Sequence, residues 1–203
     1  MHITLIGMSN IGKSHWSHHL ANTAGYERVG CDDLVEARLG SELTKHGFRG
    51  IHDVAKWMGQ PYDTQYAETS RIYKEHEQAT MLDVIARLRS STTPLVIDTT
   101  GSVIYTGDAI LQELRKLSQV VYFEASPDHV TQLFERYIAH PKPVIWGDSY
   151  QPNTGETSAD TLRRCYPALL KDRAARYQAI AHVSVPFAEH KAVSATWKGL
   201  VEG

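Results

Sequence analysis

The sequence predicts an α/β/α sandwich, in which a mostly or wholly parallel β-sheet lies between two layers of helices. Short apolar runs typical of buried strands alternate along the chain with longer stretches of helical periodicity. A glycine-rich octet, residues 7–14, directly follows the first of these runs, residues 3–6. Alternating strands and helices favour a parallel sheet, because each crossover between parallel strands passes through a helix.

The expected elements follow one another in a regular order. Buried strands are expected at residues 3–6, 95–97, 120–123 and 183–185, and a short segment, 27–29, follows the first helix. Helices are expected from Lys13 to about residue 24, from Leu34 onward, and over 64–89, 130–137 and 162–180. Residues 41–75 are expected to form a helical insertion. Ligands of such sheets bind beyond the carboxyl ends of the strands.

The octet has the pattern GxxxxGK[ST] of a phosphate-binding loop. Its glycines let backbone N–H groups turn toward the α- and β-phosphates, its lysine reaches the β/γ oxygens, and its serine hydroxyl ligates Mg²⁺. A preceding strand and a following helix are the setting that this loop requires; a glycine-rich turn without function is the alternative. We therefore expect a P-loop NTPase domain that binds ATP and Mg²⁺ through Gly7, Ser9, Asn10, Ile11, Gly12, Lys13 and Ser14.

Composition excludes several classes of partner. The 203 residues, 42% hydrophobic, suit one domain over 1–203, and a net charge of −2 offers no basic surface for nucleic acid or anionic lipid. No run approaches the ~18 apolar residues that span a bilayer. The first strand begins near His2, so no signal peptide is expected and the cytoplasm is the expected compartment. No pattern indicates an oligomeric state.

Carboxylates occur at two places in the sequence that are expected to lie at the same edge of the sheet as the octet. Asp98 ends a predicted strand, the position from which a Walker-B-type aspartate reaches the Mg²⁺ shell; a helix cap is the alternative. Asp32 and Asp33 follow segment 27–29, and at least one is expected in the same cleft, where it could accept a hydroxyl's proton. For Asp33, capping of the next helix is the favoured alternative.

Two arginines and one irregular segment complete the candidates. Arg173 lies on the apolar stripe of the last long helix, and an inward guanidinium needs an anionic ligand or a carboxylate of the chain. Arg71 is less distinctive, since Glu68 and Glu75 make its stretch a plausible solvated face. Residues 139–160 contain prolines and glycines without periodicity, which favours a lid over a disordered loop.

Over most of its length the chain resembles shikimate kinase and related small-molecule P-loop kinases. The octet matches the phosphate loop of that family. Residues 29–40 resemble the segment that carries its DxD motif, followed by a helix with Glu and Arg-x-Gly. Lys142-Pro143 resembles the Arg-Pro of its lid.

The resemblance implies an ATP-dependent kinase that transfers the γ-phosphate to a hydroxyl of a small, carboxylate-bearing metabolite. Asp32 would hold and activate this hydroxyl, while Lys142 and Lys13 would contact the transferred phosphate. Arg71, Arg173 and Gly101 would bind the acceptor, and Arg136 the nucleotide.

Three departures from the family concern the metal and the acceptor. Gly30 stands where the family has the first aspartate of DxD, so Asp98 is expected to take over the metal together with Ser14. The glycine triplet of the acceptor pocket reads Asp98-Thr99-Thr100-Gly101, and residues 57–62 add length on the expected substrate side. A nucleoside or nucleotide kinase and a non-catalytic nucleotide-binding protein are the alternatives. The sequence has no Asn-Lys-x-Asp guanine-reading motif, which disfavours a GTPase.

Overall fold

The computed structural model describes residues 1–126, 130–192 and 195–198. A five-stranded sheet with the strand order β2-β3-β1-β4-β5 forms its centre, and all of its described pairings are parallel. The strands are β1 (His2–Ile6), β2 (Glu27–Gly30), β3 (Leu95–Asp98), β4 (Ser118–Phe123) and β5 (Val183–Val185). The predicted α/β/α architecture with a parallel sheet is confirmed.

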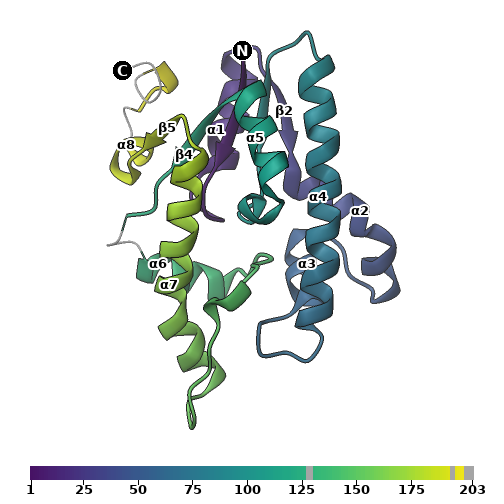
Figure 1. Cartoon of the computed structure of the whole chain (residues 1–203), viewed down its shortest axis with the longest axis vertical. Coiled ribbons are helices and arrows are strands. Elements are labelled where there is room, and N and C mark those ends of the chain that lie inside the picture. Colours follow the sequence, from purple (N-terminus) through teal and green to yellow (C-terminus); the bar gives the residue numbers. More distant parts are fainter. Residues whose placement is uncertain (127–129, 193–194, 199–203) are drawn as a thin grey trace.

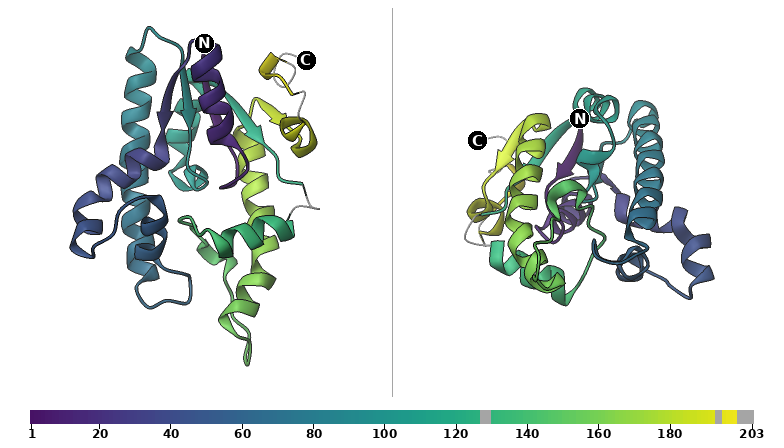
Figure 2. Two further views of the ribbon diagram at one scale, coloured as in Figure 1. Left: turned by 180° about the vertical axis from the view of Figure 1, so that it is seen from behind. Right: turned by 60° about the horizontal axis from the view of Figure 1, so that its bottom comes forward.

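Helices cover both faces of the sheet. Helix α1 lies on one face, whereas α4, α5 and α7 lie on the other (Figures 1 and 2). The described helices are α1 (Lys13–Thr23), α2 (Cys31–Lys45), α3 (Ile51–Met58), α4 (Tyr66–Ser90), α5 (Asp108–Leu117), α6 (Val130–Ala139), α7 (Ser158–Ile180) and α8 (Phe187–Lys191). Among the described residues, no helix is both long and apolar enough to cross a membrane.

The segment that follows the first helix is a fifth strand, β2, at the edge of the sheet. Its sequence carries charged Glu27 and Arg28, which hides the apolar signal of a strand, since an edge strand is only partly buried. Helix α2 begins directly after it at Cys31 rather than at Leu34. Asp32 and Asp33 therefore lie in the first turn of α2, where the helix dipole favours negative charge.

Two hydrophobic clusters support the fold. The larger one joins the sheet to the helices on its two faces. The smaller one lies within the predicted insertion and its neighbours, and its buried members are Val35, Leu39, Leu43, Val54, Trp57, Met58, Tyr73 and Ile145. Helices α2 and α3 pack beside the half of α4 that extends past the sheet (Figure 1). Residues 41–75 thus contain the end of α2, all of α3 and the start of α4, which pack together around this smaller cluster.

The predicted lid segment divides into two parts. Residues 143–146 are buried, and the hydroxyl of Tyr66 donates to the carbonyl of Val144 at 2.9 Å and accepts from the N–H of Trp146 at 2.8 Å. Residues 151–155 are exposed and precede α7. The first half of the segment is therefore hydrogen-bonded to α4 through Tyr66. Its role as a lid stays a prediction.

Candidate active site

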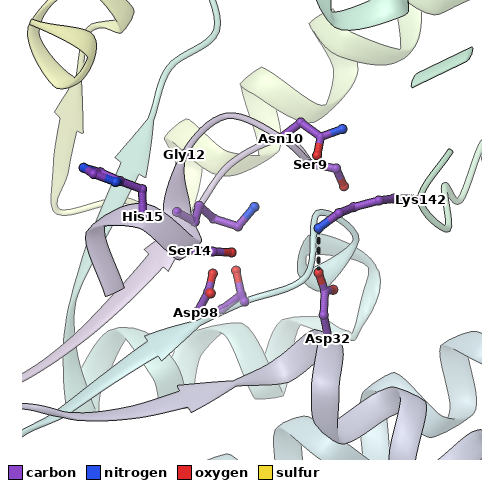
Figure 3. A pocket seen from close by; sticks show the side chains of 10 residues that line it. Ser9, Asn10, Gly12, Ser14, His15, Asp32, Asp98 and Lys142 are labelled. Atoms are coloured by element: carbon purple, nitrogen blue, oxygen red, sulfur yellow. Dashed lines mark hydrogen bonds and ion pairs between the residues drawn. The ribbon is translucent and has the colours of Figure 1, made fainter. Parts of the chain in front are cut away.

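The carboxyl ends of β1, β2 and β3 meet at one edge of the sheet, where the phosphate-binding loop lies. Asp98 is the register partner of both Leu5 in β1 and Gly30 in β2, so the residues that follow these strands start at one level. A cavity of about 250 Å³ opens at this edge (Figure 3). Its lining consists of Ser9, Asn10, Gly12, Lys13, Ser14, His15, Asp32, Asp98, Thr99 and Lys142.

The backbone of the loop needs its glycines. Gly7 has a φ of +141°, and a Cβ there would lie 2.8 Å from the carbonyl oxygen of Phe123. Gly12 has a φ of +121°, also in the region that side chains disfavour. These two positions let the chain turn from β1 into α1 so that backbone N–H groups can face a phosphate.

Lys13 is buried at the first position of α1, with its Nζ donating to the carbonyls of Gly7 at 2.9 Å and Met8 at 3.0 Å. Burial lowers the pKa of this ammonium to about 8, although attraction by Asp98 and Asp32 opposes the shift. The ammonium therefore lies within the loop, and a bound phosphate would restore its usual basicity.

Asp32 and Lys142 face each other across the cavity (Figure 3), and Asp32 Oδ2 lies 3.3 Å from Lys142 Nζ. Asp32 comes from the first turn of α2, whereas Lys142 comes from the segment after α6. The structure thus brings together a carboxylate and a cation that 110 positions separate in the chain.

Asp98, at the end of β3, has an arginine partner that the sequence did not indicate. Its Oδ2 lies 2.7 Å from Arg28 Nη2 and accepts a hydrogen bond from Ser17 Oγ at 3.1 Å. Arg28 Nη1 also lies 3.3 Å from Asp33 Oδ2, so Asp33 pairs with Arg28, and α2 has no side-chain cap. The sequence signal that could have indicated this pair is the alternation of side chains along a strand, which places Arg28 and Gly30 on the same face of β2.

The residues around the cavity fit a nucleotide with Mg²⁺. Ser14 supplies a hydroxyl and Asp98 a carboxylate, and both line the cavity beside the buried ammonium of Lys13. Hard oxygen ligands of this kind suit Mg²⁺, which in phosphotransferases is held by one or two protein side chains together with phosphates and water.

The two arginines predicted for the acceptor differ in placement. Arg71 lies on the solvent face of α4, where its side chain is 52% exposed and pairs with Glu68 at 2.7 Å and with Glu75. Arg173 is fully buried, and its Nη1 and Nη2 donate to the carbonyls of Gly101 at 3.1 Å and Ile145 at 2.6 Å. The structure does not bring Arg71 to the cavity. Arg173 also contacts Met8 Sδ at 3.8 Å and lies over the Tyr105 ring, and none of its described partners is a carboxylate.

Gly101 lies against the phosphate-binding loop. A Cβ at this position would lie 2.7 Å from Ser9 Oγ and 3.0 Å from Ser9 N. Arg136 is exposed on α6 and lies outside the cavity lining. Burial lowers the pKa of Lys191, and the positive charge of Arg136 lowers it further. Lys191, which sequence reasoning missed, places its Nζ 2.8 Å from where a Cβ of Gly12 would stand.

A buried acid, Glu77, lies behind the cavity on the inner face of α4. Its Oε1 accepts hydrogen bonds from the hydroxyls of Ser102, at 2.6 Å, and Thr100. Its Oε2 is buried and has no partner among the described residues. Burial raises the pKa of Glu77 to about 7, and the negative charge of Asp32 adds to the shift. Glu77 was not singled out from the sequence, because the charged residues nearby, Glu68 and Glu75, favoured a solvated face for this stretch of α4.

The chain is similar to known proteins in sequence and in fold. No family model matches the chain. A curated shikimate kinase from Paracidovorax citrulli (strain AAC00-1) is 27% identical over 138 residues, which are 68% of this chain and 61% of the relative. The match thus spans about three fifths of the length of that relative.

Solved structures of shikimate kinases share the fold. The enzyme from Bacteroides thetaiotaomicron gives a TM-score of 0.60 at 18% identity, with 95% of this chain and 90% of that chain covered. The enzyme from Acinetobacter baumannii, solved in complex with shikimate, gives 0.57 at 20% identity, with 91% and 82% covered. The chain is therefore similar to shikimate kinases in sequence and has their P-loop NTPase fold, as its motifs predicted.

Proposed function

We propose that the protein is an ATP- and Mg²⁺-dependent kinase that transfers the γ-phosphate to a hydroxyl of a small metabolite. The observation that carries this proposal is the shared cavity. Asp32, Lys142, Lys13 and Asp98 all line it, and Asp32 lies within 3.3 Å of Lys142. A phosphate cradle, a metal-binding carboxylate, a second cation and a carboxylate for the acceptor are the parts that phosphoryl transfer needs.

Each residue has a part in the reaction. Lys13 and the loop N–H groups would hold the phosphates, and Lys142 would neutralise charge on the phosphoryl group. Asp32 would orient the acceptor hydroxyl and accept its proton as the new O–P bond forms and the bond to the ADP oxygen breaks. Ser14 and Asp98 would hold Mg²⁺, which neutralises phosphate charge. A kinase that uses ATP in this way would act in the cytoplasm.

Shikimate is the first acceptor to test. The curated relative is named shikimate kinase, and the Acinetobacter baumannii structure holds shikimate. Of the two arginines predicted to bind an acceptor carboxylate, Arg173 is the better placed, because it contacts Gly101 beside the loop whereas Arg71 faces solvent.

A panel assay tests the proposal. ADP release from Mg·ATP is followed in a coupled assay with shikimate, other hydroxy acids, nucleosides and a blank without acceptor. We expect release that depends on shikimate or another hydroxy acid and is lost in Asp32→Asn. ADP release that depends only on a nucleoside or nucleotide would show that the acceptor is of this class and is not a hydroxy acid. Tight ATP binding without acceptor-dependent release would contradict the kinase proposal and indicate a non-catalytic nucleotide-binding protein.

A further inference from the structure

Arg28 links the metal-site carboxylate to the edge strand of the sheet. Its Nη2 pairs with Asp98 Oδ2 at 2.7 Å, and its Nε donates to Ser17 Oγ at 2.9 Å, which in turn donates to the same Asp98 oxygen at 3.1 Å. Gly30 and Asp98 are register partners in neighbouring strands. Since side chains two positions apart in a strand share a face, Arg28 runs along β2 past Gly30 to reach Asp98.

Gly30 is a glycine because of space and not because of its backbone. Its φ of −87° and ψ of 106° are open to any residue. A Cβ at Gly30, however, would lie 2.6 Å from Arg28 Nη1 and 2.9 Å from Nη2, and nearer still to Asp33 Oδ2. A side chain here would require the ends of the Arg28 and Asp33 side chains to shift, so the position of the guanidinium is tied to the residue at position 30.

The burial of Asp98 explains why the arginine matters. Asp98 is 5% exposed, and a buried carboxylate is costly without a charged or hydrogen-bonded partner. Both described partners of Asp98 are on Oδ2. The two donors, from α1 and β2, therefore fix the orientation of the carboxylate at the cavity, where it lies beside Ser14 (Figure 3).

We propose that Arg28 is a positioning residue for the metal site: it holds Asp98 by one oxygen so that the carboxylate can serve Mg²⁺ in place of the aspartate absent at Gly30. Arg28 itself is not among the residues that line the cavity. This inference rests on the proposed function, because it takes Asp98 as part of a Mg·nucleotide site. It adds the residue that makes this use of Asp98 possible.

The test measures how strongly Mg²⁺ strengthens ADP binding, without any acceptor. ADP affinity is determined by calorimetry with Mg²⁺ and with EDTA, and the ratio of the two affinities is the coupling. Loss of a partner that orients a metal ligand commonly costs about 10- to 100-fold in metal affinity, so Arg28→Ala should lower the coupling by about that factor. ADP affinity in EDTA should change by less than about threefold, since Arg28 lies outside the phosphate loop.

Two further variants identify the cause. Arg28→Lys keeps a cation and should recover part of the coupling. Arg87→Ala is the matched control, because Arg87 pairs with Glu27 at the other end of β2, away from the cavity, and this variant should keep the full coupling.

Gly30 supplies a test that leaves Arg28 in place. Gly30→Ala should displace the guanidinium and lower the coupling, yet have no further effect when Arg28 is already alanine. Arg28→Ala with Gly30→Asp should recover coupling, because the freed space receives a carboxylate. If Arg28→Ala does not fold, Gly30→Ala and Arg28→Lys decide the question, since both keep the charge.

Several outcomes would overturn the proposal. An unchanged or increased coupling in Arg28→Ala would mean that Arg28 only neutralises Asp98, and equal losses from Gly30→Ala with and without Arg28 would remove the link between the two residues. A wild-type protein with no Mg²⁺ coupling would also overturn it. A kinase assay that fails with every acceptor, while the coupling responds as expected, would contradict the proposed function and leave the role of Arg28 standing.

Discussion

The Asp32 carboxylate lies 3.3 Å from the Lys142 ammonium, and this pair connects the first turn of α2 to the segment between α6 and α7. Each group is partly exposed, at 32% and 23% of its side chain, so both can reach a ligand in the cavity. A hydroxyl that accepts a phosphoryl group needs a base on one side and a cation near the phosphate. The pair places a carboxylate and a cation side by side in the cavity.

Asp32→Asn should lower kcat by about 10²- to 10⁴-fold, the usual contribution of a general base, because the amide cannot accept the hydroxyl's proton. ADP affinity should stay within about threefold of wild type. Steady-state kinetics with the accepted substrate and calorimetry with ADP measure the two quantities. Asp83→Asn, which changes an exposed carboxylate on α4 paired with Arg38, is the control and should keep full activity. Equal kcat values in the two variants would exclude Asp32 as the base.

Lys142→Ala should lower kcat by about 10²-fold or more, because a cation that stabilises the transferring phosphoryl group is lost. Lys142→Arg should keep a larger share of activity, since it retains the charge. The same kinetic assay compares both with Lys116→Ala, which removes an exposed lysine paired with Glu113. A loss confined to the KM of the acceptor would make Lys142 a binding residue only.

ADP binding should be accompanied by proton uptake at pH 9 but not at pH 7. Burial lowers the pKa of Lys13 to about 8, so this group is largely neutral at pH 9 in the free protein. Bound phosphates favour the ammonium and raise the pKa again, which draws in about one proton at pH 9. Calorimetry in two buffers of different ionisation enthalpy measures the uptake. Lys13→Arg should abolish it, because arginine stays charged, and uptake that persists in this variant would assign the proton to another group.

Glu77 should make the protein less stable as the pH rises from about 4.5 to 7. Burial raises its pKa from 4.5 to about 7, so the folded state binds the proton more tightly than the unfolded chain. The stability that the neutral form provides is fully present below pH 4.5 and is lost as the pH rises through 7.

The shift corresponds to on the order of 3 kcal/mol in the free energy of unfolding. Urea unfolding of wild type and Glu77→Gln at pH 4.5 and pH 8 measures it. The difference between the two proteins should change by about that amount in favour of the variant at pH 8. Parallel pH profiles would show that Glu77 is not held neutral.

Arg71→Ala and Arg173→Ala should differ in how much they lower stability. Arg71 is exposed and pairs only on the surface, so its removal should change the free energy of unfolding by less than about 0.5 kcal/mol. Removal of the buried Arg173 leaves the Ile145 carbonyl without its described donor and opens a cavity, which should cost about 3 kcal/mol or more. Chemical denaturation compares them. An acceptor KM that rises in Arg71→Ala would show that Arg71 reaches the site in the bound state.

The sequence predicted the elements whose signal is local. The octet, the strand before it and the helix after it are specified by glycine positions and short-range periodicity, and four of the five strands were visible as apolar runs. β2 was less visible because an edge strand can carry charges such as Glu27 and Arg28. The register that sets Gly30 opposite Asp98 depends on strand order, which a local pattern does not contain.

Contacts between distant side chains were the least predictable part of the site. The resemblance that suggested Arg71 gave only its position along α4, and a helix places residues 71 and 77 on different faces. Glu77 turned inward and Arg71 outward because of how α4 packs on its neighbours. The pairing of Arg28 with Asp98 likewise depends on α1, β2 and β3 meeting, through Ser17, at one edge of the sheet.

The short run from Val144 to Trp146 has a consequence for how the protein opens. Val144 and Trp146 pack into the larger hydrophobic cluster, whereas Ile145 between them packs into the smaller one. The helices around α3 therefore cannot lose their packing without disturbing the sheet's own core. Amide hydrogen exchange should find both regions opening as one cooperative unit, whereas the exposed residues 151–155 should exchange faster.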